Sequence, residues 1–551
     1  MAQQVNEQDK DGVSAIWRHE QGFEPKYEQR TPVELKVVGS IPKYAAGVLY
    51  RTGPGGHQED GPNGKPVIMS HWFDGFTQVH RFKIDATNDA TTPIRVFYNS
   101  RLEVDEILQT IRETGDLKDF TFGQKRDPCE SFFQKVMSTF TSAVTSAAKP
   151  SGPRGPTTAN VGVTLSVNLP GFQTIGNDSE PSIASHSSGI KTLHNKTDAN
   201  IFQQIDPETL EPIGLATQTS LHPLLKGPMS AAHAKADPET GDIFNYNLDI
   251  GMKSTYQVFH TSASTGQTEI LATIQDRPAY LHSLFLSGSY VILCIWSAHY
   301  SKAGVSLLAN KNILESIAPF DPTKKAKWYV IDRRNGKGLV ATYESDPFFC
   351  FHTINAWERP SPSDPSKTEI VCDVTKHDNL DILHALYYKS LMSIPTPDVP
   401  RPSVARFVLP DVPSTPSSEL REAKLVFDSP KDFGAELPII NPAYFTKEAR
   451  YVYGIANRGR STLTDGLVKF DYQTQTTVYW EKWSHTPGEP IFVADPEGSG
   501  EDDGVLLSVV LDGEVGKSYL LCLDARTMEE VGRAEVDGVV GFGFHGRHVR
   551  L

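Results

Sequence analysis

"IDPETLEPIG", residues 205–214, is the stretch that decides the fold, because a similar phrase, "ADPETGDIF", follows at 236–244. A third version, "LDARTMEEVG", stands near the end of the chain at 523–532. Each version places a polar turn between two short β-prone runs, which is typical of a strand–turn–strand unit. Distant parts of the chain are therefore expected to share one antiparallel plan.

Further short β-rich runs recur between turns rich in Gly, Pro and Asp, and long amphipathic helices are nearly absent. This pattern predicts an all-β protein built from many antiparallel blades. Seven blades of roughly 50–70 residues each would use most of the chain. We therefore expect one domain, 1–551, with residues 1–30 as an arm over the surface. Two β-sandwich domains are the alternative, but no clean linker divides the chain.

The composition makes several classes of protein improbable. A net charge of −14 disfavours a nucleic-acid partner, because phosphate binding normally requires a basic surface. Five scattered cysteines without a CxxC pair, and a polar N-terminus, favour a reduced, cytoplasmic protein. No run approaches the ~18 apolar residues of a membrane span. Hydrolase motifs such as GxSxG and HExxH do not occur, and no obligate protein partner is evident.

Four of the 17 histidines lie among small or apolar residues at expected strand ends: His233, His282, His352 and His545. Their separations of 49, 70 and 193 residues match no local metal motif. They would suit one ligand from each of four blades, all directed at a central axis. A competing pattern is "HWFDG" at 71–75, whose His and Asp match part of the two-histidine, one-carboxylate site of many Fe(II) oxygenases.

Six phrases resemble the signature set of the carotenoid cleavage oxygenases, in the same order and over nearly the whole chain: "HWFDGF", "AHAKADPETGD", "YLHSLFLSGSYVIL", "FHTINAWE", "EPIFVADPEGSGEDDG" and "GFHG". The resemblance implies a seven-bladed β-propeller with a cap of loops and helices over its top face, enclosing an apolar tunnel. It implies one non-haem Fe(II) on the four histidines. It also implies O₂ as co-substrate and cleavage of a conjugated C=C bond into two aldehydes.

The resemblance further implies carboxylates that accept from the N–H groups of the ligand imidazoles that face away from the metal. By their surroundings these are Asp198, Glu436 and Glu489, with no acid available for His233. The family more usually has Glu where Asp198 stands, and the shorter side chain makes that contact less certain to form. The alternative is that these three are ordinary surface carboxylates.

The same matching places Phe122, Thr197 and Phe544 on the substrate tunnel, although the two phenylalanines would also suit an ordinary core. Stilbene-cleaving relatives grip a phenol with a tyrosine and a lysine. Here Thr197 stands at the lysine's position, Lys196 is one residue too early, and 157–170 contains no tyrosine. The expected substrate is therefore an apolar polyene, torulene or a β-carotene-like carotenoid, as in fungal members of the family. A stilbene-cleaving oxygenase and a catalytically silent carotenoid-binding propeller remain the alternatives.

An apolar polyene must be collected from a membrane, and residues 125–150 are the predicted membrane-facing part of the cap. Apolar residues there recur at near-helical spacing, as in an interfacial helix: Phe132, Phe133, Val136 and Phe140. The sequence thus predicts peripheral association with an intracellular membrane. Packing of this stripe against the propeller is the alternative. Cys129 is a candidate for lipidation on proximity alone.

Overall fold

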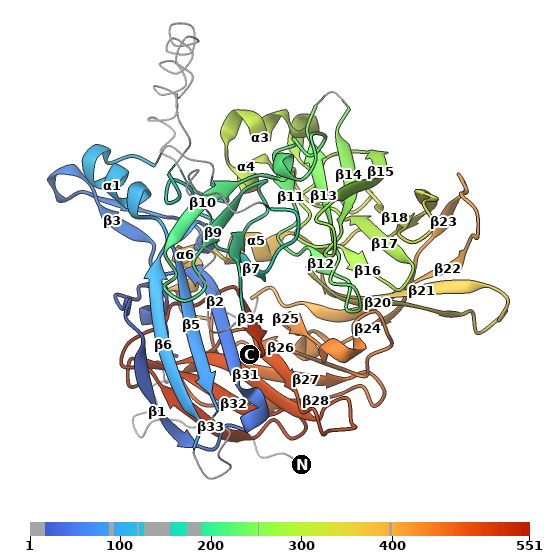
Figure 1. Ribbon diagram of the computed structural model, residues 1–551. Coiled ribbons are helices and arrows are strands. Elements are labelled where there is room, and N and C mark those ends of the chain that lie inside the picture. The colour runs from blue at the N-terminus through green and yellow to red at the C-terminus, as the bar shows by residue number, and fades with distance from the viewer. Residues whose placement is uncertain are drawn as a thin grey trace, which may run out of the picture.

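The computed structural model describes residues 17–86, 93–117, 121–125, 155–172, 189–251, 253–395 and 399–551, without the side chains of 308–310. Over these ranges the protein is all-β and propeller-like, as predicted (Figure 1). It contains five sheets of four or five strands, a ten-stranded sheet and a two-stranded ribbon. The ribbon pairs β3 (Gln58–Asp60) with β4 (Pro66–Ile68).

Three of the smaller sheets are built from residues 164–345, together with the later strand β23. One has the order β10-β9-β8-β7 and comprises β7 (Thr164–Val167), β8 (Leu193–Lys196), β9 (Phe202–Ile205) and β10 (Pro212–Ala216). The next comprises β11 (Met229–Ser230), β12 (Lys235–Ala236), β13 (Ile243–Asp249), β14 (Thr255–Thr261) and β15 (Thr268–Gln275). The third comprises β16 (Phe285–Leu286), β17 (Tyr290–Ile295), β18 (Ala326–Asp332), β19 (Leu339–Ser345) and the parallel β23 (Leu420–Glu422).

Two further sheets follow, each with four antiparallel strands. The first contains β20 (Phe349–Pro360), β21 (Thr368–His377), β22 (Ser403–Val412) and β24 (Lys424–Asp428). The second contains β25 (Glu436–Ile439), β26 (Tyr451–Ala456), β27 (Gly466–Asp471) and β28 (Thr476–Trp480). The turn phrases of the sequence lie where expected, since 205–214 joins β9 to β10 and 523–532 joins the last residues of β32 to β33.

The ten-stranded sheet joins the two ends of the chain. Its C-terminal strands are β29 (His485–Pro487), β30 (Ile491–Ala494), β31 (Gly504–Asp512), β32 (Lys517–Asp524), β33 (Glu530–Glu535) and β34 (His545–Val549). Its N-terminal strands are β1 (Val33–Gly39), β2 (Gly47–Pro54), β5 (Thr77–Asp85) and β6 (Arg95–Leu102). Because β1 pairs with β33 and β2 pairs with β34, the ring is closed by strand pairing between the termini (Figure 1).

Several strands are buried on both faces, as expected where neighbouring sheets pack face to face around the ring. β17, with the sequence YVILCI, is buried along almost its whole length, and so is the first part of β20. Such strands appear in the sequence as continuous apolar runs rather than as alternating patterns. The largest core cluster includes Trp296, Trp328 and Tyr280 and extends from this region to the cap.

The described part of the predicted N-terminal arm is anchored rather than free. Trp17 is buried and donates a hydrogen bond from Nε1 to Oγ1 of Thr486 at 2.9 Å. Phe23, in the short helix Glu20–Phe23, packs edge-on against Phe542. The arm therefore contacts β29 and the segment that precedes β34.

Short helices and loops form a cap: α1 (Asp105–Thr114), α3 (Val305–Asn310), α4 (Ile313–Ser316), α5 (Asp381–Ala385) and α6 (Tyr388–Leu391). The "HWFDG" motif ties this cap to the sheets. His71 donates from Nε2 to the carbonyl of Leu383 at 2.9 Å, while its Nδ1 accepts from the amide of Phe73 at 3.2 Å. The amide of Trp72 donates to the carbonyl of Leu386 at 3.0 Å.

Protonation of His71 would break this tie, because a charged imidazole cannot accept at Nδ1. Burial lowers its pKa to about 3, so between pH 6.5 and 3 the unfolded chain binds a proton that the folded chain rejects. Stability should therefore fall as pH drops through this window. For His71→Gln we expect a shallower fall, by up to about 1.4 kcal/mol per pH unit. Urea unfolding at a series of pH values tests this, and parallel pH profiles for the two proteins would contradict it.

Candidate metal centre and cavity

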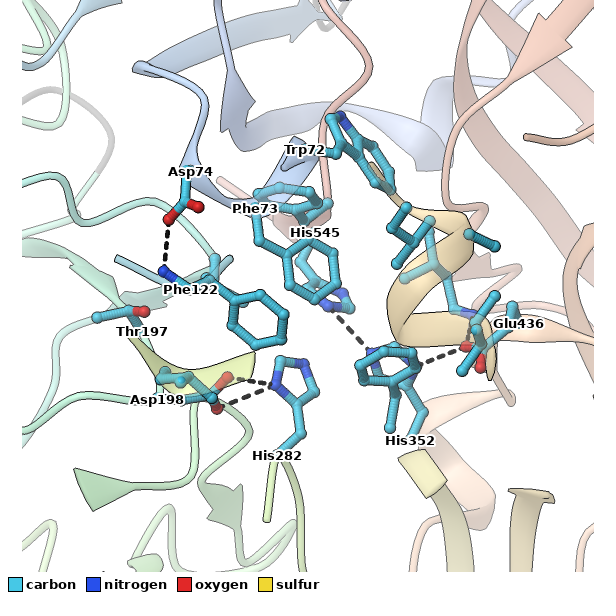
Figure 2. A pocket seen from close by; sticks show the side chains of 18 of the residues that line it. Trp72, Phe73, Asp74, Phe122, Thr197, Asp198, His282, His352, Glu436 and His545 are labelled. Atoms are coloured by element: carbon cyan, nitrogen blue, oxygen red, sulfur yellow. Dashed lines mark hydrogen bonds and ion pairs between the residues drawn. The ribbon is translucent and has the colours of Figure 1, made fainter. Parts of the chain in front are cut away.

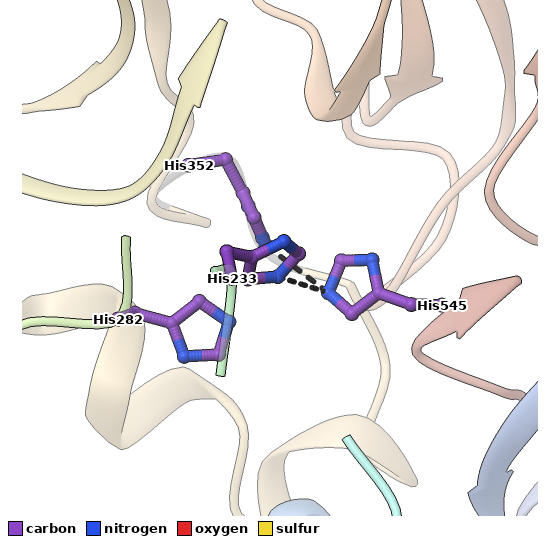
Figure 3. Close-up of side chains that lie close together, drawn as sticks. All are labelled: His233, His282, His352 and His545. Atoms are coloured by element: carbon purple, nitrogen blue, oxygen red, sulfur yellow. Dashed lines mark hydrogen bonds between the residues drawn. The ribbon is translucent and has the colours of Figure 1, made fainter. Parts of the chain in front are cut away.

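Four histidines from four separate segments meet at one buried point. His233 lies between β11 and β12, His282 just before β16, His352 on β20, and His545 at the start of β34. One ring nitrogen from each lies within 4.8 Å of the others, and Figure 3 shows the four rings facing one another. Nε2 of His545 lies 2.9 Å from Nε2 of His233 and 3.3 Å from Nε2 of His352. The structure thus brings together all four histidines singled out in the sequence.

A carboxylate lies behind three of these rings. Nδ1 of His282 is 2.9 and 2.8 Å from the two oxygens of Asp198. Nδ1 of His352 is 2.6 Å from Oε2 of Glu436, and Nδ1 of His545 is 2.8 Å from Oε1 of Glu489. The shorter side chain of Asp198 therefore does reach its imidazole. Among the described residues no carboxylate is recorded on His233.

These contacts determine which nitrogens carry protons. A carboxylate only accepts, so Nδ1 of each of the three rings donates, and a neutral ring then presents an unprotonated Nε2 to the centre. Burial lowers the pKa of His352 to about 4 and keeps the pKa values of His233 and His545 well below their ordinary value. His352 and His545 therefore hold two lone pairs 3.3 Å apart. A cation between them removes that repulsion, so the donor set fits a divalent transition metal.

Each carboxylate is itself held by further groups. Asp198 accepts from the hydroxyl of Tyr280 at 2.8 Å and from the amide of Ala232 at 3.0 Å. Glu489 accepts from the amide of Gly546 at 2.7 Å and lies 3.5 Å from the buried guanidinium of Arg51. Sequence reasoning missed Tyr280 and Arg51, because nothing in their local sequence shows which carboxylate they contact.

Glu436 contacts a second histidine. Its Oε1 accepts from Nε2 of His377 at 2.9 Å, and its Oε2 also accepts from the amide of Leu437 at 2.9 Å. Burial alone would raise the pKa of Glu436, but His352 and His377 lower it below its usual range. Burial does raise the pKa of Glu489, to about 7, against the opposing charge of Arg51. The three carboxylates therefore differ in their electrostatic settings.

A cavity of about 470 Å³ opens onto three of the four histidines, His282, His352 and His545 (Figure 2). Most of its wall is apolar, and aromatic rings dominate the part that faces the centre. Phe73 and Phe122 lie there in the view, and the ring centroid of Phe351 is 5.8 Å from that of His282. The three residues predicted for the substrate tunnel all line it: Phe122, Thr197 and Phe544. This volume is within the range of small-molecule binding sites, about 300–1,000 Å³.

The competing pattern in "HWFDG" has another role. Both oxygens of Asp74 accept backbone N–H groups, from Phe122 at 2.5 Å and from Gly123 at 2.8 Å. Both ring nitrogens of His71 form hydrogen bonds with backbone groups. In the described part of the chain, the four histidines are the one group of three or more His, Cys, Asp or Glu side chains close enough to share a metal ion. The two-histidine, one-carboxylate interpretation is therefore wrong for this motif.

Comparison with known proteins decides the family. The family model described as RPE65, retinal pigment epithelial membrane protein, matches residues 22–550. The chain belongs to the RPE65 and carotenoid oxygenase family. A carotenoid dioxygenase of Neurospora crassa is 43% identical, with 97% of this chain and 91% of that protein covered. A torulene dioxygenase of Gibberella fujikuroi is 39% identical, with 97% and 94% covered.

More distant members of the carotenoid oxygenase family share the whole length. The β,β-carotene 15,15′-dioxygenase of mouse is 26% identical over 95% of this chain and 90% of its own. A solved structure of a Synechocystis apocarotenoid oxygenase variant superposes with a TM-score of 0.72 at 19% identity, covering 98% of this chain and all of the other. A cobalt-substituted form of the same enzyme gives a TM-score of 0.70 at 19% identity over 98% and 100%. At this identity, the structural likeness establishes the propeller-like fold of this family.

The residues predicted for membrane contact lie outside the described part of the chain: Phe132, Phe133, Val136 and Phe140, together with Cys129 and nearly all of 125–150. Their roles stay predictions. Among the described helices of this carotenoid oxygenase family member, none is long and apolar enough to span a membrane.

Removing the charge of Asp74 should release the loop that carries Phe122. In Asp74→Asn the amide can accept only through its oxygen, so at least one of the two backbone N–H groups loses its acceptor. We expect the free energy of unfolding to fall by about 1.5–3 kcal/mol, the usual range for hydrogen bonds to charged groups. Urea denaturation measures this. Asp364→Asn is the control, since Asp364 accepts from Ser366 in a surface turn, and an equal loss in both variants would contradict the prediction.

Proposed function

We propose that this protein is a non-haem Fe(II) dioxygenase that uses O₂ to cleave a conjugated C=C bond of a carotenoid or apocarotenoid into two aldehydes. The observation that carries the proposal is the convergence of unprotonated Nε2 atoms at the wall of an apolar cavity. The names of the relatives at 39–43% identity, carotenoid dioxygenase and torulene dioxygenase, support the same reaction. The cobalt-substituted neighbour is consistent with a metal site in this fold.

The residues of this chain would hold, orient and isolate the reacting groups. Fe(II), when bound by His233, His282, His352 and His545, supplies the activation of O₂. Burial keeps the imidazoles neutral, while the outer carboxylates orient the rings and their charge offsets that of the metal. No described group in the cavity is needed as a general acid or base in this scheme. Specificity would then come from which double bond the wall places beside the centre.

The cavity wall favours an apolar polyene, torulene or a β-carotene-like carotenoid. Phe122 and Phe544 would contact the chain of the polyene beside the metal. Thr197 lines the same wall, next to Asp198. Of the charged side chains on the wall, Asp74 is bonded to backbone amides and Lys431 is paired with Asp378 at 3.0 Å. A charged or phenolic substrate therefore finds few free partners along this surface.

We infer further that the sheets form a seven-bladed propeller in one domain. Within the ten-stranded sheet, β1 changes partner along its length: Val33–Leu35 pair with β6, and Lys36–Gly39 pair with β33. This supports counting that sheet as two blades joined through β1, which with the five smaller sheets makes seven. Peripheral association with a membrane is part of the proposal, because the substrate dissolves in lipid rather than in water.

The substrate test incubates the Fe(II)-loaded protein in air with torulene, β-carotene and resveratrol, and identifies the products by mass. We expect aldehydes from one or both carotenoids and none from resveratrol. Products from resveratrol alone would favour a stilbene cleaver, and carotenoid binding without O₂ consumption would favour a silent binding protein. The absence of binding and of product with all three compounds would refute the proposal.

His352→Ala should lose both stoichiometric iron and product formation, because it removes a ligand and leaves Oε2 of Glu436 without its imidazole donor. Iron content by metal analysis and product by mass are the two measurements. His260→Ala is the control, since His260 lies on β14, outside the cavity, beside Asp242. Retention of iron by His352→Ala would show that this histidine is not a ligand.

A further inference from the structure

The backbone bends sharply beside Glu436. Leu437 has φ of +46°, in the left-handed region that residues other than glycine avoid. That conformation is unfavourable for an L-residue, because Cβ comes too close to the following carbonyl oxygen. The pairing of β25 with β26 also shifts register between Glu436 and Ile439. Such a conformation persists only where surrounding contacts enforce it.

The bend serves two parts of the site at once. It turns the amide of Leu437 back onto Oε2 of Glu436 at 2.9 Å, the same oxygen that receives Nδ1–H of His352. It also places Leu437 on the cavity wall, next to Glu436. Any movement of this bend would therefore shift both a ligand imidazole and the surface that meets the substrate.

Strand β21 supplies the contacts that hold the bend. Thr375 donates from Oγ1 to the carbonyl of Ala435 at 2.8 Å, and His377 donates from Nε2 to Oε1 of Glu436 at 2.9 Å. Residues 375 and 377 lie on the same face of the strand, since side chains alternate with a period of two. His377 is only 3% exposed, and its ring packs against Phe349 and Phe351 at centroid distances of 6.0 and 6.1 Å.

The support of Glu436 differs from that of the other two carboxylates. Besides its imidazole, Asp198 accepts from the Ala232 amide on one oxygen and from the Tyr280 hydroxyl on the other. Oε2 of Glu489 is held by the Gly546 amide and by Arg51. In Glu436 the Leu437 amide and the His352 imidazole share Oε2. Among the described residues, His377 is the one whose side chain donates a hydrogen bond to Oε1.

We propose that His377 is a positioning residue for the metal centre and the cavity wall together. It fixes the Glu436 carboxylate so that Oε2 orients His352, and with Thr375 it holds the bend that presents Leu437 to the substrate. The inference rests on the proposed function, since the metal concerned is the iron of that proposal. His377 would touch neither the metal nor the substrate.

The test compares His377→Asn with His377→Gln. The Gln amide nitrogen can take the place of Nε2 and still donate to Glu436, whereas the Asn amide nitrogen takes the place of Nδ1 and falls short. Competition with a metal chelator measures Fe(II) affinity. We expect a loss of about tenfold for His377→Asn, the lower end for a group behind a ligand, and recovery in His377→Gln. His485→Asn, at a buried histidine on β29 bonded to Tyr519, controls for loss of a core imidazole.

A second variant separates the two roles of the bend. Glycine tolerates φ of +46°, so Leu437→Gly should keep the bend and the Fe(II) affinity while altering the cavity wall. We expect a changed KM or product distribution with iron binding near the wild-type value. His377→Asn should change both the iron affinity and the products.

The outcomes distinguish this inference from the proposed function. Unchanged Fe(II) affinity in His377→Asn, or an equal loss in His377→Gln or His485→Asn, would overturn the inference alone. If His377→Asn does not fold, His377→Phe, which keeps the packing against Phe349 and Phe351, replaces it. Wild-type protein that binds no Fe(II) would overturn both. Wild-type protein that binds Fe(II) but cleaves no carotenoid would overturn the proposed reaction, while the affinities would still decide the role of His377.

Discussion

Three imidazoles that donate their Nδ1 protons to carboxylates must turn their Nε2 lone pairs toward the same buried point, and the rest of the structure depends on this electrostatic constraint. Lone pairs held this close repel each other, and burial prevents protons from relieving the repulsion. A divalent cation relieves it directly. When all three carboxylates are ionised, their charge would balance that of such a cation and the buried Arg51, which lowers the cost of placing them in the interior.

No single segment of the chain can bring these imidazoles to one point, so the ring of sheets has to assemble them from separate strands. His545 reaches the centre because β34 pairs with β2, which brings the last residues of the chain beside the first strands (Figure 1). His233 and His282 are set against each other by a backbone hydrogen bond of 3.2 Å. The strand pairing that closes the ring therefore also places His545 at the centre.

The cap places an apolar cavity over the polar centre. The polar side chains of "HWFDG" form hydrogen bonds with backbone groups of the cap. His71 donates to the carbonyl of Leu383, and Asp74 accepts from the amides of Phe122 and Gly123. Little polar surface from this motif is then left for the cavity, whose wall next to the histidines consists mainly of rings (Figure 2). The bend at Leu437 contacts both the cavity and the centre. Its side chain lines the cavity, and its amide donates to Glu436, the carboxylate behind His352.

The sequence by itself determined the class of fold and singled out the four histidines and the three carboxylates that the structure brings together. Repeated turn phrases and buried apolar runs depend on local periodicity, and the settings of the four histidines and of Asp198, Glu436 and Glu489 are recognisable in short phrases. Only the tertiary structure decided what lies behind them. The contacts of Tyr280, Arg51 and His377, the reach of Asp198 and the tie made by Asp74 all depend on sheet register and on backbone bends. Such contacts join residues tens or hundreds of positions apart, and no local pattern records which hydrogen-bond donor will face which acceptor.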